Sequence, residues 1–233
     1  MTEPLVLVPG LNCTDALFRP QSDVFSTERH VLIVDQTQDD TIAAMAERAL
    51  AEAPPRFALG GLSMGGYVAL AMQRMAPERV TRLALLDTTA RPDTEDGTAR
   101  RRTLMELART GRFAEVHQTL WPRLVHPDRH ADAALEAIVR QMMDDTGVDA
   151  FCRQQEAIIA RPDSRPLLSA ITCPTLVLVG AQDAITPVEM AQEMADAIPG
   201  ATLTAVPETG HLATLEAPVH VNAALAKWLL RPV

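Results

Sequence analysis

Three side chains in this 233-residue sequence have the chemistry of an activated nucleophile: Ser63, Asp183 and His211. A serine hydroxyl attacks a carbonyl carbon efficiently only when a neighbouring base removes its proton, and the base must itself be held in one orientation. An imidazole meets the first requirement, and a carboxylate bonded to its second ring nitrogen meets the other. Because the three residues lie far apart in the chain, the fold must bring them together.

Ser63 lies in a setting that predicts a sharp turn between a buried strand and a helix. The residues Gly-Leu-Ser-Met-Gly at 61–65 follow a short apolar run at 57–59 and precede a helical pattern at 67–75. A strand that turns at once into a helix strains the turn residue and crowds its neighbours, which favours glycine beside the serine. The Ser63 hydroxyl would then project from the carboxyl end of the strand. The alternative is a glycine-rich turn whose serine merely caps the helix.

Asp183 and His211 each follow an apolar run that predicts a later strand. Asp183 ends a Gly-Ala-Gln-Asp segment directly after the run at 175–179, and His211 follows the run at 201–206 after a short loop. The carboxyl ends of parallel strands meet at one edge of a sheet, so both side chains would lie on the same edge as Ser63.

Asp87 is an alternative to Asp183 as the acid that orients the imidazole. It ends the strand predicted at 80–87, which immediately follows the unit that carries Ser63, and a carboxylate there could reach the same histidine. Asp183 is preferred because a Gly-x-x-Asp segment after a strand is the usual setting for this acid.

Two backbone N–H groups could stabilise the negative charge that develops on the substrate oxygen. The N–H of Met64 lies at the start of the predicted helix, where the helix dipole favours negative charge. The N–H of Leu11 follows Gly10 in the loop after the first apolar run, and the glycine lets the backbone turn inward. These two donors would form an oxyanion hole.

The order of apolar runs and helical patterns predicts an α/β fold. Near-continuous apolar strands that alternate with helices are typical of a parallel sheet covered on both faces. The predicted strands lie at 4–10, 30–35, 57–59, 80–87, 175–180 and 201–206. The predicted helices between and after them lie at 14–25, 41–53, 67–75, 187–198 and 217–230.

The segment 91–166 interrupts this alternation with helical patterns alone. The patterns lie near 98–109, 112–121, 130–144 and 148–160, separated by glycine or proline. The segment is therefore predicted to be a helical insertion, and 1–90 together with 167–233 to be one core domain.

Charge and hydropathy argue against several classes of function. The formal net charge is −9, whereas phosphate binding needs clustered lysine and arginine, so no nucleic-acid partner is expected. The one basic cluster, Arg100–Arg102, is expected on a solvated face. No apolar stretch approaches the length of a membrane span, and the first four residues lack the basic segment of a signal peptide.

The three cysteines favour a reducing cytoplasm. Cys13, Cys152 and Cys173 are odd in number and form no Cys-x-x-Cys pair, which predicts neither a disulfide framework nor a zinc site. His126 and His130 are four residues apart, but no cysteine or further histidine completes a metal set. We expect no metal and no cofactor.

With these residues in place, the chain resembles the α/β-hydrolase superfamily over almost its full length. The resemblance is carried by Pro9-Gly10, by Gly-Leu-Ser-Met-Gly-Gly at 61–66, by Gly-Ala-Gln-Asp at 180–183 and by Gly210-His211. The serine turn and the helical insertion are similar to those of small bacterial members such as enol-lactonases, carboxylesterases and carbon–carbon hydrolases. The resemblance implies that the insertion, 91–166, is a cap that sets substrate shape.

Two departures from the family pattern bear on the fold and on the oxyanion loop. Family members usually begin with an extra antiparallel hairpin, whereas here the first apolar run starts within five residues of Met1. We therefore expect a shortened, mostly parallel sheet of about six strands. Many relatives also carry His-Gly where this chain has Pro9-Gly10, which changes the loop but keeps the Leu11 donor.

These observations predict a serine hydrolase that cleaves a small carboxylic ester or lactone through an acyl-enzyme. A second hypothesis is a carbon–carbon hydrolase or lyase with the same triad, in which an arginine would hold the substrate carboxylate. The arginines considered for that role are Arg100, Arg102, Arg123, Arg153 and Arg161. A third hypothesis is a non-catalytic ligand-binding module on a hydrolase scaffold. The sequence leaves a homo-oligomer open.

Overall fold

The computed structural model describes residues 2–233 and contains a six-stranded sheet. The strands are β1 (Leu5–Val8), β2 (Val31–Ile33), β3 (Phe57–Leu62), β4 (Val80–Leu86), β5 (Thr175–Gly180) and β6 (Thr202–Val206). Their order in space is β2-β1-β3-β4-β5-β6, and every neighbouring pair is parallel. The predicted six-stranded parallel sheet is confirmed. Five strands lie within their predicted ranges, whereas β3 runs three residues beyond its predicted end at residue 59, to Leu62.

Helices cover both faces of the sheet because alternate strand residues are apolar on each side. In β1, Val6 and Val8 join one buried cluster, while Leu5 and Leu7 join the other. The first cluster is completed by α2 (Ile42–Glu52), α3 (Met64–Met75) and α7 (Val188–Ala197), and the second by α1 (Arg19–Phe25) and α9 (Pro218–Leu229). The inner strands β1, β3, β4 and β5 are therefore buried on both faces, as their continuous apolar sequences predict, whereas the edge strands β2 and β6 are only partly buried.

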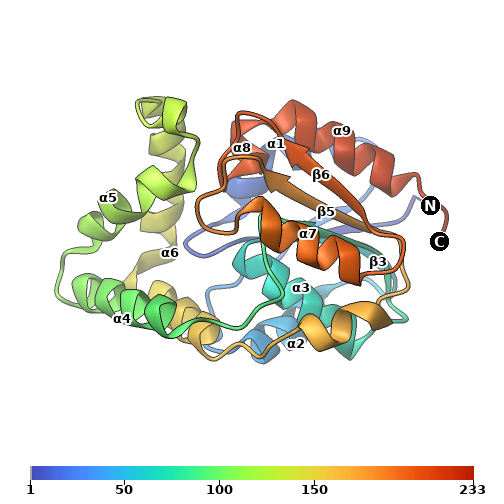
Figure 1. The fold of residues 1–233 in the computed structure, drawn as a ribbon, viewed down its shortest axis with the longest axis horizontal. Helices are drawn as coiled ribbons and strands as arrows, with labels where there is room; N and C mark the ends of the chain where they lie inside the picture. The colour runs from blue at the N-terminus through green and yellow to red at the C-terminus, as the bar shows by residue number, and fades with distance from the viewer. Residues whose placement is uncertain (1) are drawn as a thin grey trace.

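Three further helices stand beyond the carboxyl ends of the strands: α4 (Glu95–Arg109), α5 (Phe113–Leu124) and α6 (Ala133–Ile159). In Figure 1 they form a layer at the left, on the side toward which the arrowheads of β5 and β6 point. They pack on one another through a small apolar cluster of their own, which includes Met105, Val116 and Phe151. The layer, which we call the helical layer, lies at the edge of the sheet where the strand-to-helix loops emerge.

Two breaker residues in the helical layer act differently from each other. Gly147 has φ 74° and ψ 166°, so the helices predicted at 130–144 and 148–160 meet there at a kink within α6. Pro122, by contrast, does not end α5 at residue 121 as its type predicts, because the helix runs on to Leu124. A proline in the last turn removes one hydrogen bond of a helix that is already ending, so its cost there is small.

The crowded turn between β3 and α3 generates a stability prediction for two adjacent glycines of β3. A Cβ on Gly61 would overlap the backbone carbonyl of Gly65, whereas a Cβ on Gly60 would meet the movable Cδ2 of Leu7 at 3.0 Å. We expect Gly61→Ala to lower the free energy of unfolding by at least about 3 kcal/mol, and Gly60→Ala to change it by less than about 1 kcal/mol. Denaturant unfolding measures both, and equal losses would contradict the steric account.

Candidate active site

Ser63 lies on the turn between β3 and α3, in a backbone conformation that is rare for residues other than glycine. Its φ is 56° and its ψ is −116°. The Ser63 N–H donates to Leu86 O at 3.0 Å, and the Thr88 hydroxyl donates to Ser63 O at 2.7 Å. Glycine is required nearby, because a Cβ on Gly65 would overlap the carbonyl of Val8. The surrounding backbone thus holds a strained residue in one position.

The Ser63 hydroxyl lies against His211. Ser63 Oγ is 2.8 Å from His211 Nε2, and His211 Nδ1 is 2.7 Å from Asp183 Oδ2. Ser63 occupies the N-cap position of α3 but makes no side-chain cap hydrogen bond, so the alternative of a capping serine is wrong. The three side chains form one continuous run of hydrogen bonds at distances that suit proton transfer.

Asp183 is buried and ionised. Its Oδ1 accepts from the N–H groups of Ile185 at 2.7 Å and Thr186 at 2.9 Å, and its Oδ2 accepts from the Thr186 hydroxyl at 2.8 Å. Burial by itself raises the pKa of Asp183, but the charge and hydrogen bond of His211 and these N–H groups hold the pKa below its ordinary value. The carboxylate can therefore keep the imidazole in one orientation and stabilise its protonated form.

Asp87 is buried directly after the end of β4. Within the described residues it makes no hydrogen bond to His211. Its Oδ1 accepts from the Gly180 N–H at 2.8 Å, and its Oδ2 is buried with no partner in residues 2–233. Burial raises the pKa of Asp87 well above its ordinary value, and the negative charge of Asp183 adds to the rise. The carboxylate that accepts the hydrogen bond of the imidazole is therefore that of Asp183.

The loop after β1 passes directly beside Ser63. A Cβ on Gly10 would lie 3.4 Å from the Ser63 Cβ. Within the described chain, neither the Leu11 N–H nor the Met64 N–H donates to a protein acceptor, so both are free to meet a ligand oxygen. Burial raises the pKa of the Cys13 thiol in this loop to about 12, which keeps it neutral.

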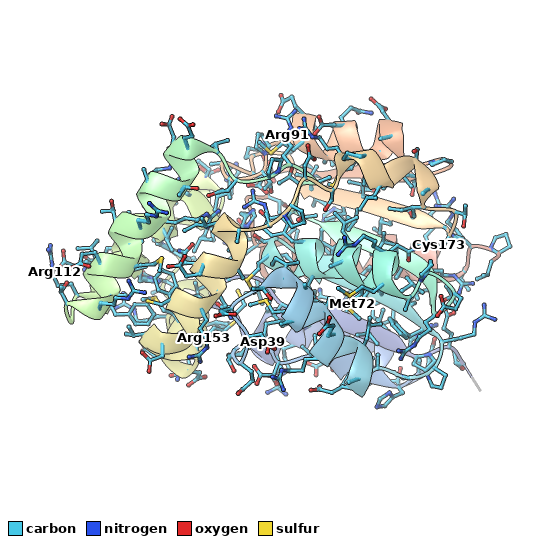
Figure 2. The ribbon with its side chains drawn as sticks, turned by 90° about the horizontal axis from the view of Figure 1, so that it is seen from below. Asp39, Met72, Arg91, Arg112, Arg153 and Cys173 are labelled. Atoms are coloured by element: carbon cyan, nitrogen blue, oxygen red, sulfur yellow. The ribbon has the colours of Figure 1, made fainter. Side chains whose placement is uncertain are left out.

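Gln154 ties the loop after β1 to the helical layer. This buried side chain accepts from the Asn12 N–H at 3.0 Å and donates to Gln36 O at 3.0 Å. The neighbouring Arg153 donates to Thr37 O at 3.1 and 2.8 Å, at the junction of the helical layer and the sheet, where Figure 2 labels it. The position of the predicted oxyanion loop thus depends on α6.

Glu216, in the short helix α8 (Ala213–Glu216), holds the backbone on both sides of His211. Its Oε1 accepts from the N–H groups of Gly210 at 3.0 Å and Leu212 at 3.2 Å, and its Oε2 accepts from the His126 N–H at 2.7 Å. Burial raises the pKa of Glu216, and these N–H groups oppose the rise. The carboxyl group joins the loop that carries the histidine to the segment after α5.

Sequence reasoning missed both Glu216 and Gln154. A signal existed for Glu216, because it is a charged residue in the otherwise largely apolar stretch 212–219, which favours a buried and bonded carboxylate. No comparable signal marks Gln154, since a glutamine on a long helix is usually exposed.

A cavity of about 690 Å³ opens above Ser63 and His211. The loop after β1 and the helical layer both line it, with apolar side chains from Leu104, Leu107 and Met143 among them. Of the arginines considered from the sequence, Arg100, Arg123 and Arg161 line the cavity, whereas Arg102 and Arg153 do not. Arg101, which was expected on a solvated face with its neighbours, also lines the cavity, and its side chain is only 22% exposed.

Two further observations concern metal sites and membrane-spanning helices in the described chain. In residues 2–233, no group of three or more His, Cys, Asp or Glu side chains is arranged to hold a metal ion. Over the same residues, no helix has the length and apolar character needed to cross a membrane.

Residues 5–225 match the alpha/beta hydrolase family, and the chain therefore belongs to this family. A thermophilic esterase from Thermogutta terrifontis, solved with malate bound, is 31% identical and superposes with a TM-score of 0.89 over 98% of this chain and 90% of that chain. The enol-lactonase from Burkholderia xenovorans LB400 has the same fold, with a TM-score of 0.90 and 24% identity over 99% of this chain and 92% of that chain.

A curated relative extends the likeness to sequence. The 3-oxoadipate enol-lactonase 2 of Acinetobacter baylyi is 28% identical over 195 residues, which cover 82% of this chain and 69% of that protein. The predicted α/β-hydrolase fold and the resemblance to esterases and enol-lactonases are thus confirmed.

The hydrogen bonds that the Glu216 carboxyl group accepts lead to a prediction about stability. In Glu216→Gln one of the two acceptor oxygens becomes an NH2 group that faces a backbone N–H, so a buried donor loses its partner. We expect the free energy of unfolding to fall by about 1–3 kcal/mol. The matched control is Glu208→Gln in the same loop, which is exposed and should change stability by less than about 0.5 kcal/mol. Denaturant unfolding measures the free energy of unfolding of both variants. An unchanged value for Glu216→Gln would show that the carboxyl group does not hold the loop that carries His211.

Proposed function

We propose that this chain is a serine hydrolase that cleaves a small carboxylic ester or lactone through an acyl-enzyme. The observation that carries the proposal is the continuous hydrogen-bonded run from Asp183 through His211 to Ser63, at 2.7 and 2.8 Å. Relatives named as an esterase and an enol-lactonase support an ester or lactone as the bond that is broken.

The proposed reaction follows from the roles of five residues. His211 Nε2 takes the proton of Ser63 Oγ while that oxygen attacks the carbonyl carbon, and Asp183 stabilises the resulting imidazolium. The N–H groups of Leu11 and Met64 bind the oxygen that becomes negative. His211 then gives its proton to the leaving alcohol oxygen. Water attacks the acyl-enzyme by the same steps in reverse and releases the acid.

The helical segment 91–166 would act as a cap over this reaction, with 1–90 and 167–233 as the hydrolase core. The cavity supports this division, because side chains of α4, α5 and α6 line it together with Ser63. Closing the site with apolar side chains excludes water and strengthens the electrostatic interactions within it. A small-molecule substrate in the cytoplasm, and a reaction without metal or cofactor, complete the proposal.

The test of the activated serine is a fluorophosphonate probe followed by intact mass. We expect one adduct on the native chain and none on Ser63→Ala, because only a deprotonated serine oxygen displaces the fluoride efficiently. A chain-length series of nitrophenyl esters then measures ester cleavage directly. Folded native protein that neither takes the probe nor cleaves any ester would refute the hydrolase and favour a binding module.

The assignment of the acid gives a second prediction. We expect Asp183→Asn to lower kcat by about 10³- to 10⁴-fold, because an amide does not hold the productive imidazole tautomer. Asp87→Asn is the matched control and should lower kcat by less than about tenfold, since Asp87 makes no hydrogen bond to the imidazole in the described chain. Steady-state kinetics on a nitrophenyl ester measures both variants. A larger loss of kcat in Asp87→Asn than in Asp183→Asn would show that Asp87 is the acid that orients the imidazole.

The pH dependence of stability separates the two aspartates independently of activity. The folded-state pKa of Asp87 is raised, so its contribution to stability is full below its unfolded pKa of about 3.9 and is lost as pH rises toward the folded value. The opposite holds for Asp183, whose pKa is depressed and whose contribution is lost as pH falls. Asp87→Asn should therefore retain more of its low-pH stability at neutral pH than the native chain does.

A further inference from the structure

The cavity above Ser63 is strongly basic although the chain carries a net charge of −9. Its described lining contains five arginines and a single carboxylate, that of Asp93. The arginines are Arg91, Arg100, Arg101, Arg123 and Arg161. Arg91, Arg100 and Arg123 are exposed, and Arg91 is paired with Glu193 at 2.8 Å. Arg101 and Arg161 are therefore the two arginines held deeper in the cavity.

Arg101 and Arg161 share Asp93 as their one anionic partner. Arg161 Nη1 lies 3.2 Å from Asp93 Oδ1, and Arg101 Nε lies 3.3 Å from Asp93 Oδ2. The side chains of Arg161 and Asp93 are 7% and 6% exposed, and that of Arg101 is 22% exposed. Two guanidinium groups that do not lose their protons therefore face one carboxylate, which leaves a net positive charge in a largely buried place.

The same cluster presents hydrogen-bond donors that lack acceptors. Arg101 Nη1 donates to Gln155 Oε1 at 2.8 Å, but its Nη2 has no acceptor in residues 2–233. Arg161 uses Nε and Nη1 on Arg91 O, Asp93 and Ile158 O, and its Nη2 is likewise free within the described chain. Gln155 is fully buried, and its Nε2 has no partner there either. All three of these groups are donors, and Gln155 Nε2 is the buried one, so the cluster is suited to bind an acceptor.

The cluster is close to the reacting serine. Arg161 stacks over the ring of Tyr67, with its Cζ 4.4 Å from the ring centre. Tyr67 on α3 lies four residues after Ser63, which is a rise of roughly 6 Å along the helix axis, and both residues line the cavity. A small molecule could therefore contact Ser63 with one end and the guanidinium groups with the other.

We infer that Arg101, Arg161 and Gln155 bind a carboxylate carried by the substrate at a point remote from the bond that Ser63 attacks. This inference rests on the proposed hydrolase function and adds the substrate class, an ester or lactone of a dicarboxylic acid. A planar carboxylate matches the forked donors of arginine, and its single charge balances the cluster, whereas a phosphate dianion would exceed it. The competing account is structural: the cluster only fastens α4 to the end of α6.

The experiment compares anionic and neutral substrates of equal shape. The nitrophenyl half-esters of succinate, glutarate and adipate carry the free carboxylate, and their methyl esters lack it. We expect the anionic member of the best pair to have the higher kcat/KM. Arg101→Met should lower the anionic-to-neutral ratio of kcat/KM by about 10- to 100-fold, mostly through KM, because it removes charge-assisted bonds made to the substrate throughout the reaction. Arg101→Lys should restore part of the ratio.

The matched control is Arg112→Met. Arg112 belongs to the same helical layer and pairs with Glu115 at 2.6 Å, but its side chain is 55% exposed and lies outside the cavity lining, at the outer end of the layer in Figure 2. Its removal should leave the ratio unchanged. A cluster with only a structural role gives a different result: Arg101→Met then lowers the unfolding temperature and leaves the ratio as it was, which would overturn the inference.

Failure of the inference and failure of the proposed function are distinguishable. If both esters are cleaved equally and Arg101→Met does not change their ratio, the hydrolase stands and the carboxylate site is refuted. If neither is cleaved, the hydrolase is refuted, and calorimetric titration of Ser63→Ala with monomethyl glutarate decides on the site. The site is supported if monomethyl glutarate binds to Ser63→Ala, if dimethyl glutarate does not, and if the further substitution Arg101→Met abolishes the binding of monomethyl glutarate. No binding, or binding indifferent to Arg101, overturns it.

Discussion

The site depends on one steric constraint: backbone segments meet around Ser63 with no room for a side chain between them. A Cβ on Gly61 would overlap Gly65, and a Cβ on Gly65 would overlap the carbonyl of Val8 at the end of β1. The left-handed φ of Ser63 costs roughly 1–2 kcal/mol by itself, and persists because the contacts around it leave no alternative. This packing also fixes the distance between the serine and the loop after β1, so the nucleophile and the predicted Leu11 donor are positioned by one contact.

The histidine is held by a second close approach, from the helical layer rather than from the sheet. A Cβ on Gly210 would overlap the backbone at Val125, and the N–H groups of His211 and Leu212 both donate to Leu124 O at 3.1 Å. The end of α5 is thus part of the support of the imidazole. A displacement of α5 would move the imidazole as well, so the helical layer does not behave as a lid that opens independently of the His211 loop.

The sequence predicted the sheet, the loops at its carboxyl edge and the three polar residues at that edge, because strand periodicity and strand-end glycines are local signals. It did not predict the support of those residues. Gln154 bonds Asn12, which lies 142 positions earlier in the chain, and Glu216 bonds His126, 90 positions earlier. Arg101 bonds Gln155, 54 positions later, and no local pattern encodes such pairs. Arg101 was expected on a solvated face with its neighbours, but one residue on a helix is a rotation of about 100°, which turns Arg101 inward while Arg102 stays exposed.

Net charge and local charge therefore describe different properties of this chain. An overall charge of −9 bears on the solubility of the chain, whereas the field inside a narrow cavity is set by the few groups that line it. Low-dielectric walls weaken the screening of those groups, so two arginines that share Asp93 have more effect on a small ligand than the surface carboxylates do. Arg101 lies on α4 and Arg161 lies in the segment after α6, whereas Ser63, Asp183 and His211 come from the loops of the sheet. The charge preference can therefore change without disturbing the hydrogen-bonded run that would carry out the chemistry.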